Sequence, residues 1–387
     1  MDTLSRKSTP PASKSKLKEV ALVFFKIGCF AFGGPAAHIA MMEDEVVTKR
    51  KWMSRDYFLD LIGATNLIPG PNSTEMTMHC GHERAGSKGL FVAGIAFIVP
   101  AVIITAVLAY LYVSYGQLPE VAPFLFGIKP AVLAIIASAI LKLGKKAIKT
   151  TDLVVIGILV LIATFLGVNE VIALLGAGVI GTLYFYLKSR VTTTTKSIIP
   201  LPVLASSLLL KTPVVQVFWT FLKVGAILYG SGYVLFAYLD AELVTKGWLT
   251  RTELIDAIAV GQFTPGPVLS TATFIGYQLS GFWGALAATT GIFLPSFLFV
   301  LILNPFVSKM RSSKILSYFL DTVNVAAVAV MLAVLITMGI ETLTDWRAIV
   351  IASISAFFIF SKWKISVMWL IAGGAVLGYL LQGIPII

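Results

Sequence analysis

The sequence has few charged residues. Asp, Glu, Lys and Arg make up 13% of its 387 residues, whereas a soluble domain carries roughly 25%. Hydrophobic residues make up 57%, and the mean hydropathy is +0.90. These values exclude an ordinary soluble domain and indicate an integral membrane protein.

Cysteine and histidine are also scarce. The two cysteines, Cys29 and Cys80, lie in apolar surroundings, which argues against a disulfide framework. Three histidines without a carboxylate pair at a standard spacing give no metal site. No phosphate-binding loop, dinucleotide fingerprint or nucleophile elbow occurs, so we expect no cofactor, no ATP-driven step and no enzymatic activity.

The formal charge of +11 is carried largely by Lys and Arg in short loops between apolar segments. In a soluble protein this charge would suggest nucleic acid, but here the basic clusters are topology signals, and no nucleic-acid partner is expected. Residues 1–18 contain Ser, Pro and Lys without an apolar core. We interpret them as a disordered basic cytoplasmic tail rather than a signal peptide.

Long apolar segments dominate the rest of the chain, and a membrane-spanning helix needs about 20 such residues. The predicted fold class is an all-α polytopic membrane protein. We predict spans at 20–42, 57–80, 90–112, 121–141, 153–166 and 171–187, and then at 214–239, 254–275, 282–306, 315–340, 348–360 and 367–384.

The chain also repeats itself. The segment from Lys26 to Lys49 recurs from Lys223 to Lys246 at a constant offset of 197 residues, and with small deletions the match continues to Pro100 and Pro295. A repeat of this length indicates duplication. We therefore divide the chain into a first repeat (19–190), a linker with a possible extra crossing (191–212) and a second repeat (213–387).

Loop charge predicts that the two halves are inverted. Basic residues follow the second and fourth predicted spans of the first half, but the third and fifth of the second half. Because positive loops stay cytoplasmic, the halves should have opposite orientations. Inversion requires an odd number of crossings before the second half, so residues 198–210 are the candidate for the missing one. The basic loop from Lys49 to Arg55 fits poorly, because this topology makes it periplasmic.

The tripeptide Pro-Gly-Pro occurs at 69–71 and at 265–267, each time inside an apolar stretch. Proline removes a backbone donor and clashes with the preceding turn, so each copy should break a helix. Broken helices at membrane depth are tolerated where they line a cavity, and transporters bind substrate there. The alternative is that each tripeptide merely kinks a packed helix.

A helix that restarts at Pro71 or Pro267 would present free N–H groups and a positive dipole end, which together form an anion site. Neutral hydroxyl and amide groups surround both breaks and can coordinate an oxyanion. The predicted substrate-binding residues at the breaks are Asn66, Pro69, Gly70, Pro71, Asn72, Ser73, Thr74, Gln262, Thr264, Pro265, Gly266 and Pro267.

Lys26 and Lys223 occupy equivalent positions within the first predicted span of each half. Ionisable residues inside spans are costly and are functional candidates by default, so we add both lysines to the predicted substrate site. Snorkelling to an interface is the alternative for Lys26, and Lys223 is predicted to lie deeper.

Glu75 lies one turn beyond the first break and has no carboxylate counterpart in the second half. This asymmetry makes Glu75 a candidate proton carrier, with a structural hydrogen bond as the alternative. Lys129 aligns with Asn324, close to Asp321, and this group is a candidate counter-charge. Asp60 and Asp256 are expected to pair with Arg55 and Arg251 at the interface.

Several of these motifs together resemble the signature of the chromate ion transporter family, in its long-chain, two-domain form. They are residues 32–38, Trp52, 69–75 and Gly81 in the first half, and 261–268 and 272–277 in the second. The resemblance implies export of chromate from the cytoplasm, attributed to the proton motive force, with sulfate as the isosteric competitor. The second half departs from the pattern, with Ser231 and Gly232 where the first has Gly34 and Pro35.

We therefore expect a secondary transporter that exports chromate across the cell membrane. A transporter of sulfate or another oxyanion, or a passive anion channel, is the alternative. The expected partners are the anion, protons and the lipid bilayer, and a homodimer remains open.

Overall fold

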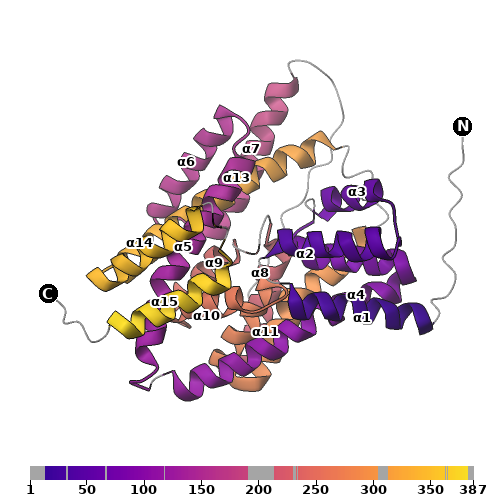
Figure 1. Cartoon of the computed structure of the whole chain (residues 1–387). Coiled ribbons are helices and arrows are strands. Elements are labelled where there is room, and N and C mark those ends of the chain that lie inside the picture. The colour runs from indigo at the N-terminus through magenta and orange to yellow at the C-terminus, as the bar shows by residue number, and fades with distance from the viewer. Residues whose placement is uncertain are drawn as a thin grey trace, which may run out of the picture.

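The computed structural model of the chain describes residues 14–31, 34–65, 68–116, 118–190, 213–229, 232, 234–303, 313–361, 363 and 365–381. Within these ranges all regular structure is helical (Figure 1). Five helices are long and apolar enough to cross a membrane: Asn72–Tyr115, Ala122–Ala147, Glu170–Lys188, Val268–Ile302 and Lys314–Thr342. The chain is thus an all-helical, multi-pass membrane protein, as its composition predicts.

The two halves have the same order of elements. The first contains α1 (Lys14–Phe30), α2 (Pro35–Met42), the π-helical η1 (Glu43–Lys49), α3 (Arg55–Thr65), α4 (Asn72–Tyr115), α5 (Ala122–Ala147), α6 (Thr151–Phe165) and α7 (Glu170–Arg190). The second contains α8 (Pro213–Ile227), α9 (Leu235–Leu239), the π-helical η2 (Asp240–Val244), α10 (Arg251–Phe263), the 3₁₀ turn η3 (Val268–Ser270), α11 (Thr271–Leu303), α13 (Lys314–Thr342), α14 (Trp346–Phe360) and α15 (Val367–Leu381).

The first predicted span, residues 20–42, is wrong as a crossing. Helix α1 ends at Phe30, and α2 begins at Pro35 after Gly34, whose φ of 78° is a left-handed conformation that favours glycine. Beyond η1, the Trp52 indole donates a 3.2 Å hydrogen bond to Glu19 near the start of α1. The segment therefore enters and returns to the same side as a helical hairpin.

The second predicted span, residues 57–80, also returns. The hydroxyl of Tyr57 at the start of α3 donates a 2.8 Å hydrogen bond to Glu83, which ends the first segment of α4. Helix α4 is interrupted at Ala85 and Gly86. A Cβ on Gly81 would clash with the carbonyl oxygen of Gly89, so residues 72–84 fold back antiparallel on the long segment 87–115.

The second half repeats both hairpins. Helix α8 is followed by α9 and η2, and α10 is followed by η3 and the first segment of α11. Helix α11 is interrupted at Ser280 and Gly281, and a Cβ on Gly276 would clash with the carbonyl oxygen of Gly284. The predicted spans 214–239 and 254–275 are therefore corrected in the same way.

The hairpins of the two halves open toward opposite ends of the long segment 87–115. Arg84, at its start, donates a 2.7 Å bond to Glu19 in the opening of the first-half hairpins. Tyr112, near its end, donates a 2.8 Å bond to Asp256 in the second turn of α10. At 1.5 Å per residue, this helix is about 43 Å long. Inverted halves require this arrangement. The basic loop from Lys49 to Arg55 therefore lies on the same side as Arg84, and not on the opposite side as the sequence-based topology predicts.

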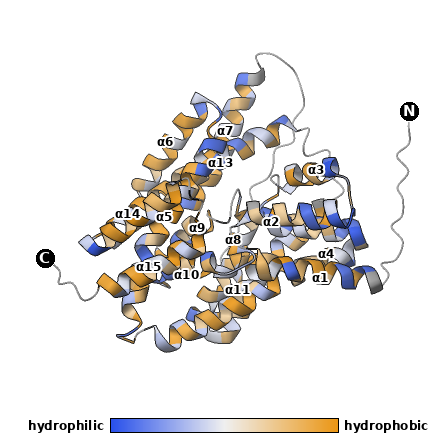
Figure 2. Cartoon of the chain, in the orientation of Figure 1, coloured by the Kyte–Doolittle hydropathy of each residue, from blue (hydrophilic) through white to orange (hydrophobic). Residues whose placement is uncertain are grey.

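Helices α5 and α13 pack against α6, α7, α14 and α15 on one side of the molecule, away from α1, α2 and α3 (Figure 1). The close approach of α5 and α15 depends on small residues, because a Cβ at Gly127 would clash with the backbone of Gly374 and Gly378. Hydrophilic residues gather at the right-hand ends of α1, α2 and α3 and at the upper ends of α7 and α13, with apolar surface between (Figure 2).

Candidate functional site: the paired helix breaks

The two Pro-Gly-Pro segments lie between short helices and contact the opposite half of the chain. Residues 68–71 are not helical, and they separate α3 from α4; residues 264–267 separate α10 from η3. The Gly70 N–H donates a 2.6 Å bond to the Leu228 carbonyl, and the Gly266 N–H donates a 3.1 Å bond to the Ala31 carbonyl. Ala31 and Leu228 are themselves equivalent residues of the repeat. Each break therefore docks on the first hairpin of the other half.

Both breaks lie beside the middle of a long helix. A Cβ on Gly266 would lie 3.1 Å from the Cβ of Ala101, which is midway between Ser87 and Tyr115. On the other side, a Cβ on Gly70 would lie 2.5 Å from the Ser296 hydroxyl of α11. The second break therefore lies beside the middle of the segment 87–115.

Neither proline is the first helical residue. Helix α4 begins at Asn72, and Pro71 precedes it as an N-cap with φ −80° and ψ 101°. Pro267 likewise precedes η3, so the first turn after the second break is 3₁₀ rather than α. The expectation that the helices restart at the prolines is off by one residue, because an N-cap residue keeps extended backbone.

Glu75 has no polar partner among the described residues. The side chain is 0% exposed, and within the described residues neither carboxylate oxygen accepts or donates a hydrogen bond. A Cβ at Gly70 would clash with both Glu75 Oε1 and Ser296 Oγ, so the carboxyl and the equally unpartnered Ser296 hydroxyl lie together at the first break. An unpaired buried carboxylate is costly, which makes Glu75 an unusual residue of this break.

The second break is chemically different. Ala101 takes the place that Ser296 has at the first, and Thr105 donates a 3.2 Å bond to Ser270. Thr264 and Thr271 donate 2.7 Å bonds to the carbonyls of Val260 and Val268. Their hydroxyl protons are thus used within the chain, whereas the buried amide nitrogen of Gln262 has no partner in the described structure.

His38 is a residue of the first break that the sequence analysis did not assign. It is 1% exposed, and its Nε2 lies 3.1 Å from the Ala31 carbonyl while its Nδ1 lies 3.1 Å from Ser73 Oγ. A carbonyl can only accept, so Nε2 carries the proton and Nδ1 accepts the Ser73 hydroxyl proton. Ser73 therefore donates to His38. The sequence signal that could have identified His38 is its position in the 32–38 motif.

Ser296 was also missed. It follows Pro295, which the repeat aligns with Pro100, and it is the polar counterpart of Ala101. A hydroxyl replacing a methyl next to an aligned proline was the signal that could have identified it.

Lys26 and Lys223 each pair with a glutamate of their own hairpin. Lys26 lies 3.3 Å from Glu45, and Lys223 contacts Glu242, the equivalent residue of the repeat. The lysine side chains are 62% exposed at Lys26 and 43% exposed at Lys223, so neither is an unpaired charge in the core. They lie between the openings of the hairpins and the breaks.

The predicted counter-charge group separates into two pairs. Lys129 lies 3.7 Å from Asp256, which is 3% exposed and also accepts the Tyr112 hydroxyl. Asp321 instead lies 2.6 Å from Lys149, and Asn324 lies on the same helix α13 three residues further on. The structure brings Lys129 to the second-half hairpin and leaves Asp321 with Lys149.

The expected interfacial pairs are also different. Arg251 contacts Asp240 at 2.9 Å and also Glu341, so its expected partner Asp256 is wrong. Arg55 contacts Glu43 at 2.9 Å. Asn66 and the side chain of Asp60 lie outside the described residues. Among those described, no three His, Cys, Asp or Glu side chains come together to hold a metal ion.

Comparisons with known proteins agree with this duplicated architecture. The profile of the family described as "Chromate transporter" matches residues 18–182 and again residues 215–379. The chain is 30% identical over 362 residues to "Probable chromate transport protein" of Synechococcus elongatus, covering 90% of each chain. It is 29% identical over 389 residues to "Chromate transport protein" of Cupriavidus metallidurans, covering 97% of this chain and 96% of the relative.

A third relative, "Chromate transport protein" of Pseudomonas aeruginosa, is 29% identical over 379 residues and covers 92% of this chain and 90% of its own. No solved structure gives a significant match. Two matches to one family profile, together spanning most of the sequence, show that this chain belongs to the chromate transporter family of membrane transporters.

Proposed function

We propose that this chain exports chromate across the cytoplasmic membrane by secondary active transport, with the anion held at the paired helix breaks. Two observations support the substrate class: the names of the similar proteins, and a structure whose buried donors at the breaks are neutral. The observation that carries the mechanism is Glu75, a fully buried carboxyl beside the first break with no partner among the described residues.

The anion site is the first turn of α4. The first turn of a helix forms a positive dipole end, and here the Thr74 and Glu75 N–H groups bond the Pro71 carbonyl, so the dipole rather than these two donors would attract the anion. The carbonyl oxygens of Ala31 and Leu228 already accept hydrogen bonds, Ala31 from Gly266 and His38, and Leu228 from Gly70. They therefore do not compete with the anion for donors of this turn. Thr74 adds a buried hydroxyl without a partner in the described structure, and Gln262 adds an amide from the second break.

Glu75 couples the anion to a proton. An ionised carboxylate and a bound dianion so close together repel each other in a poorly solvated site, so binding favours the protonated form. Anion affinity should then rise as pH falls, because protonation removes the competing negative charge. Release of the anion restores the conditions in which Glu75 can ionise.

The membrane potential is the component of the proton motive force that drives this export. A dianion that moves with one proton carries one net negative charge, and a potential negative inside favours its exit by about 2.3 kcal/mol per 100 mV. A proton gradient of one pH unit, acid outside, opposes the accompanying proton by about 1.4 kcal/mol. Export is therefore favourable at ordinary potentials.

Chromate uptake into inverted membrane vesicles tests the proposal. We expect an interior-positive potential to drive chromate accumulation, protons to enter with the anion, and sulfate to compete. Accumulation that does not respond to the potential would reject secondary active export. Anion flux without proton movement would instead identify a passive channel, and preference for sulfate over chromate would identify another oxyanion as the substrate, since tetrahedral dianions use the same donors.

A further inference from the structure

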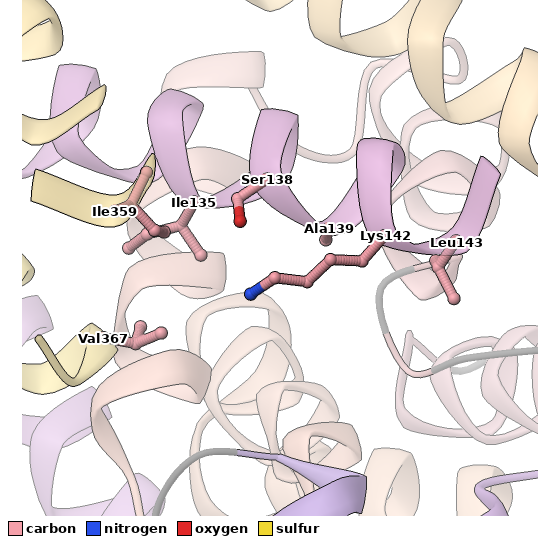
Figure 3. Close-up of a pocket in the computed structure, with 7 residues that line it drawn as sticks. All are labelled: Ile135, Ser138, Ala139, Lys142, Leu143, Ile359 and Val367. Atoms are coloured by element: carbon pink, nitrogen blue, oxygen red, sulfur yellow. The ribbon is translucent and has the colours of Figure 1, made fainter. Parts of the chain in front are cut away.

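A small cavity of about 110 Å³ lies between α5, α14 and α15, and its lining includes no residue of either break. Its walls are mostly apolar and come from Ile135, Leu143, Ile359 and Val367. Two polar groups enter it, and both belong to one face of α5: Ser138 and, one turn later, Lys142 (Figure 3).

Ser138 carries a buried hydroxyl at the wall of this cavity. The residue is 2% exposed, and its Oγ has no hydrogen-bond partner among the described residues, including the carbonyl one turn earlier that helical serines often use. Buried hydroxyls without a partner are rare in native structures, and each calls for an explanation such as an unseen ligand.

Lys142 points into the same cavity. In Figure 3 its Nζ extends back along α5 and ends between Ser138 and Val367, rather than toward the end of α5 where Lys145 and Lys146 lie. A lysine near the end of a membrane helix ordinarily snorkels outward to water. Lys142 remains an exposed residue while it lines the cavity, and no ion pair of its ammonium occurs among the described residues, so the ammonium has an open position for an anion.

We propose that this cavity binds the phosphodiester of an anionic phospholipid from the cytoplasmic leaflet, held by the Lys142 ammonium and the Ser138 hydroxyl. The end of α5 is basic, with Lys142, Lys145, Lys146 and Lys149, which places it on the cytoplasmic side by loop charge. Basic pockets between membrane helices on this side bind anionic headgroups.

The apolar walls favour a lipid over a free oxyanion. A phosphodiester fills the small cavity, while its acyl chains can lie along neighbouring exposed apolar side chains such as Leu141 and Phe360, which are 54% and 52% exposed. The bound lipid would join α5 to Ile359 of α14 and Val367 of α15, and so stabilise the contact of the first repeat with the second.

Purified full-length protein in nanodiscs of phosphatidylcholine, with or without phosphatidylglycerol, tests the site by thermal melting and by native mass spectrometry. We expect phosphatidylglycerol to raise the melting temperature and to remain bound. Lys142→Gln should weaken phosphatidylglycerol retention about tenfold or more, the scale of a lost charged hydrogen bond. Lys145→Gln removes the same charge outside the cavity and should retain the lipid as the wild type does.

Three results would overturn the proposal. Equal lipid retention by Lys142→Gln and Lys145→Gln would leave only a general surface attraction. A full rise in melting temperature with sodium sulfate in pure phosphatidylcholine discs would identify a free-anion site. Full lipid retention by Ser138→Ala would show that the hydroxyl serves something other than the phosphodiester.

Discussion

The Gly70 N–H donates a 2.6 Å hydrogen bond to the Leu228 carbonyl oxygen, at the turn of the first hairpin of the other half. The equivalent bond from Gly266 to Ala31 measures 3.1 Å. Each repeat donates one of these two bonds and accepts the other, so a shift of either break would move a hairpin of the other repeat. The pair is a physical link through which the two halves can change conformation together.

Gly70→Ala should destabilise the protein. The φ of 141° at Gly70 is unfavourable for alanine, and the new Cβ would clash with Glu75 and Ser296. We expect a loss of about 1–3 kcal/mol in the free energy of unfolding. Gly339→Ala is the matched control, since a Cβ there meets nothing within 4 Å on helix α13. Equal melting curves for the two variants would contradict the prediction.

Glu75→Gln should abolish proton coupling while preserving anion binding. The amide has nearly the same shape and imitates the protonated acid, so anion affinity should lose its rise at low pH and protons should no longer enter with the anion. Binding and vesicle pH measurements check both. Asp321→Asn is the control, because Asp321 pairs with Lys149 near a helix end. Wild-type pH dependence in the glutamine variant would assign Glu75 a structural role.

Lys223→Gln should fold normally but transport poorly. Glu242 keeps Lys246 at 2.6 Å after the substitution, so no carboxylate is left unpaired. If Lys223 attracts the anion, transport should fall about tenfold or more, as for a lost charged hydrogen bond. Lys246→Gln breaks the other contact of Glu242 and should retain transport. Equal losses in both variants would mean that the ion pair is structural.

Asp256→Ala should destabilise the contact of α10 with α4 and α5. It leaves Lys129 and the Tyr112 hydroxyl without their shared acceptor. Breaking a buried pair costs roughly 3–5 kcal/mol, and Lys129, at 22% exposure, places this variant toward the lower end. The double variant Lys129→Met/Asp256→Leu should recover most of the loss in denaturant melts. A cost below about 1 kcal/mol, as for an exposed pair, would show that the three groups are not coupled.

The inverted topology predicts that Lys145 and Lys309 face the cytoplasm and that Ile387 faces the periplasm. Single cysteines at these positions, with Cys29 and Cys80 replaced, can be labelled by an impermeant reagent in cells with intact inner membranes. Only the cysteine at Ile387 should react, together with a control cysteine at Leu118 in the loop without Lys or Arg. Labelling that places Ile387 in the cytoplasm would reject an odd number of crossings before the second half. Lys309 and Ile387 lie outside the described residues.

The sequence by itself determined the membrane class, the duplication and the family. These three conclusions come from short stretches of sequence or from a comparison of two stretches. The signals are hydropathy over about 20 residues, the constant offset from Lys26 to Lys223, and the restricted backbone of Pro-Gly-Pro. The order of elements in the two halves follows from that repeat.

Only the tertiary structure decided which apolar segments cross. Residues 20–42 are long enough for a span, but a crossing helix and a hairpin of two short helices have the same composition and the same length. The hairpin forms because the turn at Gly34 lets the chain reverse and α1 packs closely along α4, where a Cβ on Gly28 would lie 2.5 Å from the Phe97 carbonyl.

The partners of the charged residues were likewise decided by packing. Asp256 is five residues from Arg251 along the chain, yet it bonds Tyr112 and Lys129, more than a hundred residues earlier. A buried carboxylate pairs with whichever donor the docked helices bring within reach, and helix docking depends on the shapes of many side chains at once. That information is distributed over both repeats, so no single motif contains it.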